Sequence, residues 1–245
     1  MSRISLAFAL ILLLSAAAFA EPLKIVTLSY PPYEFMEDGK VKGVATRVVR
    51  EVFQRMDVEI EIELLEWADA LEAVRTGEAD AIYTAFRTPE REEFLVYPTT
   101  ELVGQVTSLF VREGSAIDYN GDLVPLAKYS FGVVEKVSYG SFFDAAVEHG
   151  IIDKLIVSRN GEQSVRRFLA GESDILVSNW LEAWTILDKL NRKDGVRALS
   201  PPLQNIPSYL AFSKKSEHLD LVPGFEEALR SIRLDGTYGK LFKLN

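Results

Sequence analysis

Cysteine is absent from the 245-residue chain, and histidine occurs only twice, as His149 and His218. Without cysteine the chain has no disulfides, no thiol catalysis and no thiolate metal site. It also lacks the lipidated cysteine that tethers some exported proteins to a membrane. The two histidines stand far apart in polar, turn-like stretches and suggest no metal site. The sequence therefore indicates neither a metal nor any other cofactor.

Long apolar runs are also scarce, and the clearest one lies close to the N-terminus. Residues 1–20 have the pattern of a secretory signal peptide, with Arg3, an apolar stretch at 4–14 and a small-x-small site at 18–20. The apolar stretch is shorter than the roughly 20 residues that a membrane span needs. We expect cleavage before Glu21 and an exported protein that moves freely in the periplasm, without a lipid anchor.

Positive charge is limited too, since 27 lysines and arginines face 36 acidic residues, which gives a net charge of −9. Residues 1–20 carry one arginine and no acid, so their removal changes −9 to −10. A chain this acidic is a poor candidate for binding nucleic acid or anionic membranes. An anionic ligand would need a local positive site.

Strand-like and helix-like segments alternate along the first hundred residues of the expected mature chain. Strands are expected at 23–28, 58–64 and 81–83, helices at 44–56 and 67–76, and a hairpin turn at 37–40. This β-α-β-α-β order predicts a mainly parallel α/β sheet flanked by helices. Ligands of such sheets gather at the carboxyl ends of the strands.

A second series of similar plan follows an outgoing strand at 105–112. It comprises strands at 130–134, 155–158, 174–177 and 208–212 and helices at 138–149, 161–169, 180–191 and 224–234. In these helices we expect Phe142, Trp180 and Trp184 to face the core. Prolines 201, 202 and 207 mark a second extended crossing. Two lobes joined by two crossings predict a hinge with a ligand cleft between the lobes.

Residues 79–97 combine a strand, a loop and a helix start that together suit an anion. Thr88 is a good N-cap residue and Pro89 suits the first helical position. Arg91 lies in the same turn, and its fork of donors matches a carboxylate. Alternatively, Arg91 pairs with neighbouring Glu92 or Glu93 in an ordinary strand-to-helix junction.

Several motifs in one order resemble a known family over nearly the whole mature chain: YPPYEF, DGKVKG, WADALEAVRTGEADAI, TPER before LVYP, YSFGVVEKVS, LAFSKK and LRSIRLDGTYGKL. The chain resembles family 3 of the periplasmic solute-binding proteins, the polar amino acid type that serves ABC importers. The resemblance implies the two-lobed periplasmic-binding-protein fold of type II with two hinge crossovers. Lobe one would comprise residues 21–110 plus 205–245, and lobe two residues 111–204.

The resemblance also implies a set of ligand-binding residues: Arg91 for a carboxylate, Tyr30 and Trp67 as aromatic walls, Thr84 and Phe86 in the loop before Arg91, Ser138 and Tyr139 at a helix start, and Asn179 in lobe two. Several positions depart from the family pattern, among them Ala45 and Arg47, which replace acids usual at the start of the first helix. Asn179 stands where amino acid binders have an Asp for the ligand ammonium. Phe86 replaces a hydroxyl residue, and Lys136-Val137 replaces a Gly-Thr pair. Asn179 could also serve only as a helix N-cap.

The implied function is capture of a small carboxylate-bearing ligand, an amino acid or a related organic acid, and delivery to an ABC permease by a monomeric protein. Whether the ligand is an α-amino acid stays open. One alternative is delivery to a sensor or chemoreceptor. Another is an enzyme on the same fold, similar to periplasmic cyclohexadienyl dehydratase, which needs a carboxylic acid in the cleft. Glu34 and Glu135 are the acids expected there, but neither lies in a catalytic motif, so we assign no catalytic residue.

Overall fold

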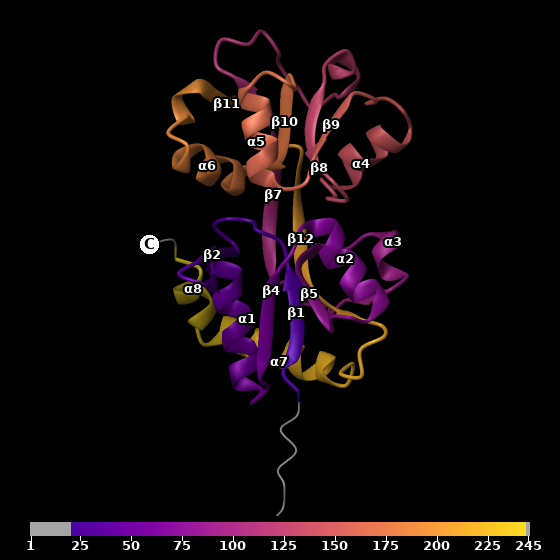
Figure 1. Cartoon of the computed structure of the whole chain (residues 1–245), viewed down its shortest axis with the longest axis vertical. Helices are drawn as coiled ribbons and strands as arrows, with labels where there is room; N and C mark the ends of the chain where they lie inside the picture. Colours follow the sequence, from indigo (N-terminus) through magenta and orange to yellow (C-terminus); the bar gives the residue numbers. More distant parts are fainter. Residues whose placement is uncertain (1–20, 244–245) are drawn as a thin grey trace, which may run out of the picture.

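The computed structural model describes residues 21–243, and the expected signal peptide at 1–20 lies outside the described residues. Two lobes lie end to end and are joined by two long strands, β7 (Val103–Arg112) and β12 (Gln204–Ser213) (Figure 1). Within residues 21–243, no helix has both the length and the apolar character that a membrane crossing requires.

Lobe one is built on a parallel sheet whose strands run in the order β4-β1-β5, with β12 antiparallel beside β5. Its remaining strands are the hairpin β2-β3 and the short β6, which pairs with β12. The bounds are β1 (Leu23–Thr27), β2 (Phe35–Glu37), β3 (Lys40–Lys42), α1 (Val44–Arg55), β4 (Ile60–Leu64), α2 (Trp67–Thr76), β5 (Ala81–Phe86), α3 (Pro89–Glu92), β6 (Leu95–Val96), α7 (Leu221–Leu234) and α8 (Thr237–Leu241).

Lobe two has the parallel strand order β10-β8-β9, with β7 antiparallel beside β10 and β11 paired to β7. Its bounds are β8 (Phe131–Val134), α4 (Ser141–Glu148), β9 (Leu155–Ser158), α5 (Gly161–Leu169), β10 (Ile175–Asn179), α6 (Trp180–Lys189) and β11 (Val196–Ala198), with 3₁₀ turns at Val124–Leu126 and Lys193–Gly195. The predicted α/β fold with two crossovers is confirmed. The lobe boundaries drawn from the sequence stay a prediction.

The two crossing strands pair with each other, so one sheet runs through the hinge in the order β4-β1-β5-β12-β7-β10-β8-β9. The parallel strands of each lobe end toward the other lobe: β5 leads to Phe86 and β10 leads to Asn179, and both residues line the same cavity. Since ligand sites form at the carboxyl ends of parallel strands, this topology places a site between the lobes.

Helix periodicity explains how the helices cover the sheet. Helix α1 buries one face, and its most buried apolar side chains follow the 3.6-residue period: Val44, Val48, Val49, Val52 and Phe53. Strand β4 alternates half-buried apolar residues with exposed glutamates, as an edge strand with one wet face does. Helix α2 spans the predicted residues, and Gly77 ends it in a left-handed conformation with φ 85°.

Two predictions about aromatic burial are wrong. Helix α4 begins at Ser141 with Gly140 as its N-cap, three residues later than expected, and its buried face is formed by Phe143 and Ala146. Phe142 therefore points outward and is 43% exposed. Trp180 is the first residue of α6 and is 46% exposed, because the buried face of that helix starts at Glu182.

Candidate ligand-binding site

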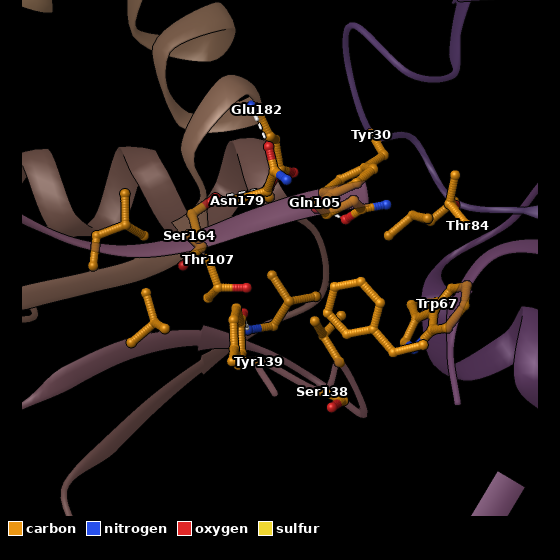
Figure 2. Close-up of a pocket in the computed structure, with 18 of the residues that line it drawn as sticks. Tyr30, Trp67, Thr84, Gln105, Thr107, Ser138, Tyr139, Ser164, Asn179 and Glu182 are labelled. Atoms are coloured by element: carbon orange, nitrogen blue, oxygen red, sulfur yellow. Dashed lines mark hydrogen bonds between the residues drawn. The ribbon is translucent and has the colours of Figure 1, made fainter. Parts of the chain in front are cut away.

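A cavity of about 40 Å³ lies between the lobes (Figure 2). All eight residues proposed from the sequence line it: Tyr30, Trp67, Thr84, Phe86, Arg91, Ser138, Tyr139 and Asn179. Their role in binding stays a prediction. The lining also includes polar residues that sequence reasoning missed: Gln105, Thr107, Ser164, Ser178 and Glu182.

Arg91 is held by the helix start that the sequence predicted. The Thr88 hydroxyl oxygen accepts a hydrogen bond from the Arg91 backbone N–H at 3.3 Å, and Pro89 occupies the first turn. The Arg91 side chain turns inward and is 5% exposed. Neither Glu92 nor Glu93 pairs with it, since Glu92 forms an ion pair with Arg87 instead. The ordinary ion-pair interpretation is therefore wrong for Arg91.

The Arg91 guanidinium is buried without a carboxylate partner among the described residues. Its Nη1 donates to the Phe86 carbonyl and its Nη2 to the Lys136 carbonyl, each at 3.0 Å, which uses two of five N–H donors. The guanidinium also lies over the Trp67 ring, 5.2 Å from the centroid. Burial lowers the Arg91 pKa from its usual value. A buried cation with donors left over suits an anionic ligand group.

Thr84 lies at an irregularity in β5, where the register against β12 shifts between Tyr209 and Ala211. Its φ of 59° is unusual for a β-branched residue, and such backbone irregularities cluster at functional sites. Its hydroxyl donates to Oε1 of Glu34 at 2.6 Å. Glu34 is fully buried behind Thr84, and burial raises its pKa well above the usual range. Glu34 thus supports the loop and is not itself part of the cavity lining.

Tyr30 connects the cavity wall to the hinge. Its hydroxyl donates to Oε1 of Gln105 on β7 at 2.7 Å, and Nε2 of Gln105 donates to the Ser208 hydroxyl on β12 at 3.0 Å. Gln105 and Ser208 are both essentially buried. Gln105 and Thr107 are two residues apart, so they share the face of β7 that lines the cavity. That period-2 polar pair is the signal that could have revealed the floor of the site.

Asn179 caps α6, as one of its two sequence interpretations predicted. Its Oδ1 accepts from the backbone N–H groups of Leu181 and Glu182 at 2.8 and 3.0 Å. Its Nδ2 donates across the cleft to the Tyr33 hydroxyl at 3.4 Å. The amide side chain therefore organises the end of β10, and it lines the cavity as well.

Ser138 does not start a helix, which corrects the sequence interpretation, because α4 begins at Ser141. Its hydroxyl is bound to Asp144, which also accepts from the Tyr139 backbone N–H at 2.9 Å. The Tyr139 hydroxyl accepts from the Val134 backbone N–H at 2.7 Å, and burial raises its pKa far above the usual value. Both side chains thus shape the wall between β8 and α4 (Figure 2).

Glu182 is the acid that the cavity contains, and the expectation that Glu34 and Glu135 are the acids nearest the cleft is wrong. Glu182 lies one turn into α6, is 5% exposed, and accepts a hydrogen bond from the Ser178 hydroxyl at 2.7 Å. Burial raises the pKa of Glu182 to about 8. The Asn cap followed three residues later by Glu marks a helix start in the sequence, but it does not show that Glu182 faces the cavity.

The lobes touch on both sides of the cavity. The Lys136 carbonyl accepts from Trp67 Nε1 as well as from Arg91, and Nδ2 of Asn160 donates to Oε1 of Glu66 at 3.0 Å. Together with the Asn179–Tyr33 contact, these hydrogen bonds hold lobe two against lobe one. The cavity lies between these contacts, and Arg91, Glu182 and Trp67 in its lining are each at most 5% exposed.

Comparison with known proteins defines the class. The model of the family described as bacterial extracellular solute-binding proteins, family 3, matches residues 23–244. The chain therefore belongs to this family of small-ligand-binding proteins. No curated protein sequence matches the chain.

Solved structures share the fold at low sequence identity. A histidine kinase sensor domain similar to periplasmic binding proteins superposes with a TM-score of 0.79 at 19% identity, over 90% of this chain and 94% of that one. The arginine-, lysine-, histidine-binding protein ArtJ from Geobacillus stearothermophilus gives 0.78 at 18%, over 91% and 94%. An ancestral arginine-binding protein bound to arginine gives 0.76 at 20%, over 90% and 96%.

Proposed function

We propose that this protein captures a small carboxylate-bearing ligand between its lobes. One observation carries the proposal: Arg91 is buried at the cavity wall with unused donors and no acidic partner in residues 21–243. Buried charges in proteins are normally paired. A ligand carboxylate supplies the missing partner, and charge-assisted hydrogen bonds of this kind are about twice as strong as neutral ones.

The remaining walls define the body of the ligand. Tyr30, Trp67 and Phe86 supply aromatic surface on the lobe-one side, where an apolar or flat ligand body packs favourably. The hydroxyl and amide groups of Thr107 and Gln105 offer hydrogen bonds from the hinge strand. Neighbours of the same fold include arginine-binding proteins and ArtJ, which support an amino acid or a related organic acid as the ligand.

Membership of the solute-binding family supports a proposal for the cellular role. We propose an exported, periplasmic, monomeric protein that presents its ligand to the permease of an ABC importer. The similarity to a histidine kinase sensor domain supports a second destination, a sensor or chemoreceptor that docks on the closed lobes. Co-purification with the membrane fraction at saturating ligand, compared with no added ligand, separates a docking partner of either kind from free diffusion.

A thermal-shift screen of residues 21–245 tests the ligand class. The panel contains amino acids, aliphatic carboxylates and aromatic acids, because ligand binding to the folded state raises apparent stability by mass action. Carboxylate-bearing compounds should raise the melting temperature, and their amide derivatives should not. If amides stabilise the protein as well as the acids do, Arg91 does not hold a carboxylate.

A second candidate is an enzyme, and Glu182 is the observation that favours it. The dehydratase alternative needs a carboxylic acid in the cleft that is protonated near neutral pH, and the raised pKa of Glu182 meets that condition. Incubation of the purified protein with prephenate and arogenate, followed by chromatography, tests this directly. Unchanged substrates together with binding of another compound would leave only the solute-binding role.

A further inference from the structure

Glu182 is a buried carboxyl group, and no lysine, arginine or histidine among the described residues balances it. No salt bridge to Glu182 forms within residues 21–243, and Oε2 receives its hydrogen bond from a neutral hydroxyl, Ser178. Its other oxygen, Oε1, has no hydrogen-bond donor in the described part of the chain. A buried carboxylate normally requires an opposite charge or a metal. The partner of Glu182 is thus a ligand group or a proton.

Helix α5 passes close to the carboxyl group of Glu182, and two of its residues, Gly161 and Ser164, line the cavity beside it. Residue 161 is glycine, and a Cβ there would collide with Oε1 of Glu182, so a larger residue would push the carboxyl group out of its present position. Ser164, on the same helix α5, lines the cavity at 2% exposure, and its buried hydroxyl has no hydrogen-bond partner among residues 21–243. An acidic oxygen and a free hydroxyl oxygen therefore face the same end of the cavity, which is an acceptor-rich environment.

Within the part of the chain that the structure describes, the titratable groups facing Glu182 do not include a base. From the loop after β1 these are Tyr30, Tyr33 and Glu34, and from the loop after β8 it is Tyr139; the charge of Glu182 acts on all four. Tyr30 lines the same cavity as Glu182, and an aromatic ring there also favours a cation. Every nearby group is therefore neutral or acidic.

Glu182 and Arg91 serve different ends of the cavity. Figure 2 shows Glu182, Asn179 and Ser164 on one side and Trp67 and Thr84 on the other. The Arg91 guanidinium lies over the Trp67 ring and so belongs to the second side. The titratable groups that act on Arg91 are Tyr97, Asp144 and Glu90, and Glu182 is not one of them. No ion pair joins Glu182 to Arg91 among residues 21–243, so neither group neutralises the other.

We propose that Glu182, with Ser164 and the Tyr30 ring, forms a cation-binding subsite, and that the ligand carries a protonated amine or guanidinium remote from its carboxylate. The carboxylate half of this statement rests on the proposed function of Arg91. The cationic half rests on Glu182 alone. A ligand with separated charges supplies a partner to each buried charge and spans the cavity between them.

Isomeric probes test the separation of charges. 6-Aminohexanoate and L-norleucine have the same atoms, but the amine is remote from the carboxylate in the first and adjacent in the second. We expect at least one remote-cation probe to raise the melting temperature and to bind in calorimetry. The probes are 6-aminohexanoate, its shorter and longer homologues, and 4-guanidinobutyrate. L-Norleucine should bind at least tenfold more weakly. Equal or tighter binding of L-norleucine, or no response to any cationic probe, overturns the proposal.

Two singly charged probes show which half of the proposal, the carboxylate site or the cation subsite, is wrong. Hexanoate carries only the carboxylate and hexylamine only the cation. If hexanoate binds as tightly as 6-aminohexanoate, the Glu182 subsite is wrong while the Arg91 site stands. If hexylamine binds as tightly as 6-aminohexanoate, the carboxylate assignment of Arg91 is wrong while the Glu182 subsite stands.

Substitutions test whether binding of the remote cation depends on Glu182. Glu182→Gln should weaken 6-aminohexanoate by more than tenfold and leave hexanoate within twofold, whereas Glu72→Gln on the exposed face of α2 should change neither. Glu182→Asp retains the charge, so it should bind more tightly than Glu182→Gln and keeps the test valid if the amide variant folds poorly. Equal losses of both ligands in the amide variant would indicate a structural role and overturn the subsite.

Proton release supplies an independent readout. A cation bound to Glu182 displaces the proton held there, so affinity for 6-aminohexanoate should rise about tenfold per pH unit from pH 6 to 7 and level off above pH 8. Glu34 is the other acid whose titration could give such a slope. Loss of the slope in Glu182→Gln supports the subsite, and persistence of the slope in that variant overturns it.

Discussion

Trp67 and Lys136 lie in different lobes, and Nε1 of Trp67 donates to the backbone carbonyl of Lys136 at 3.0 Å. Lys136 has a φ of 58°, so the chain turns in a left-handed conformation where this carbonyl is presented to the opposite lobe. The same oxygen accepts from Arg91, which joins a lobe-one wall residue and the proposed ligand-binding cation to one point of lobe two. Trp67 and Arg91, the side chains that join the two lobes at Lys136, are therefore also members of the proposed ligand-binding site.

Trp67→Phe should weaken ligand binding about two- to tenfold, because it removes one hydrogen bond of about 0.5–1.5 kcal/mol across the cleft and keeps an aromatic wall. Calorimetry with a hit from the ligand screen measures the loss. X-ray scattering should show less compaction on ligand addition than in the unchanged protein. Trp184→Phe is the matched control, since Trp184 Nε1 is buried in lobe two without a partner in residues 21–243. Equal effects of the two changes would contradict the cross-lobe role.

Arg91→Ala should reduce affinity for a carboxylate ligand by several kcal/mol, about a hundredfold or more, since a buried charge-assisted pair is lost. Arg91→Lys should recover only part of this, because an ammonium lacks the planar fork of donors. Arg87→Ala removes the same residue type four positions earlier, where the side chain is exposed and paired with Glu92, and should change binding little. Unchanged affinity in Arg91→Ala would remove the carboxylate assignment.

The sequence predicted the elements well where local signals and packing agree. Helix α2 has its expected bounds because Gly77 provides a clear end, and Thr88 with Pro89 located the turn that carries Arg91. The eight proposed residues meet in one cavity because they follow strand ends that a parallel sheet gathers together. Glu182 was missed because its charge lies inside a helix, and only the packing of α6 against Gly161 and the cavity reveals which way it faces. Phe142 was misjudged because α4 begins three residues later than expected, and Trp180 because it is the first residue of α6, whose buried face starts at Glu182.

Without added ligand, the stability of the protein should fall as pH rises between about 4.5 and 8. Burial raises the pKa of Glu182 from its usual 4.5 to about 8, so within this window the folded state binds more protons than the unfolded state. The free energy of unfolding then decreases with rising pH, by at most about 1.4 kcal/mol per pH unit from this group. Gln at position 182 does not titrate.

Urea unfolding of the wild type and of Glu182→Gln at pH 5, 6, 7 and 8 measures this contribution. The stability of the amide variant relative to the wild type should increase steadily across the series. Glu34 also has a raised pKa and contributes a slope of the same sign, but it is present in both proteins and cancels in the difference. A difference independent of pH would show that Glu182 is ionised in the folded protein.

Asn179→Ala should lower the free energy of unfolding by about 1 kcal/mol, because its side chain accepts from two backbone N–H groups at the start of α6. Asn179→Ser should recover most of this stability, since serine is an equally good N-cap residue. Both variants lose the hydrogen bond to Tyr33 across the cleft, so both should bind ligand more weakly than the wild type. Urea unfolding and calorimetry on the same samples therefore separate the two roles of one amide: stability should follow the cap, and affinity should follow the contact with Tyr33. If Asn179→Ser restores affinity together with stability, the cap alone accounts for Asn179, and its place in the cavity wall contributes nothing to binding.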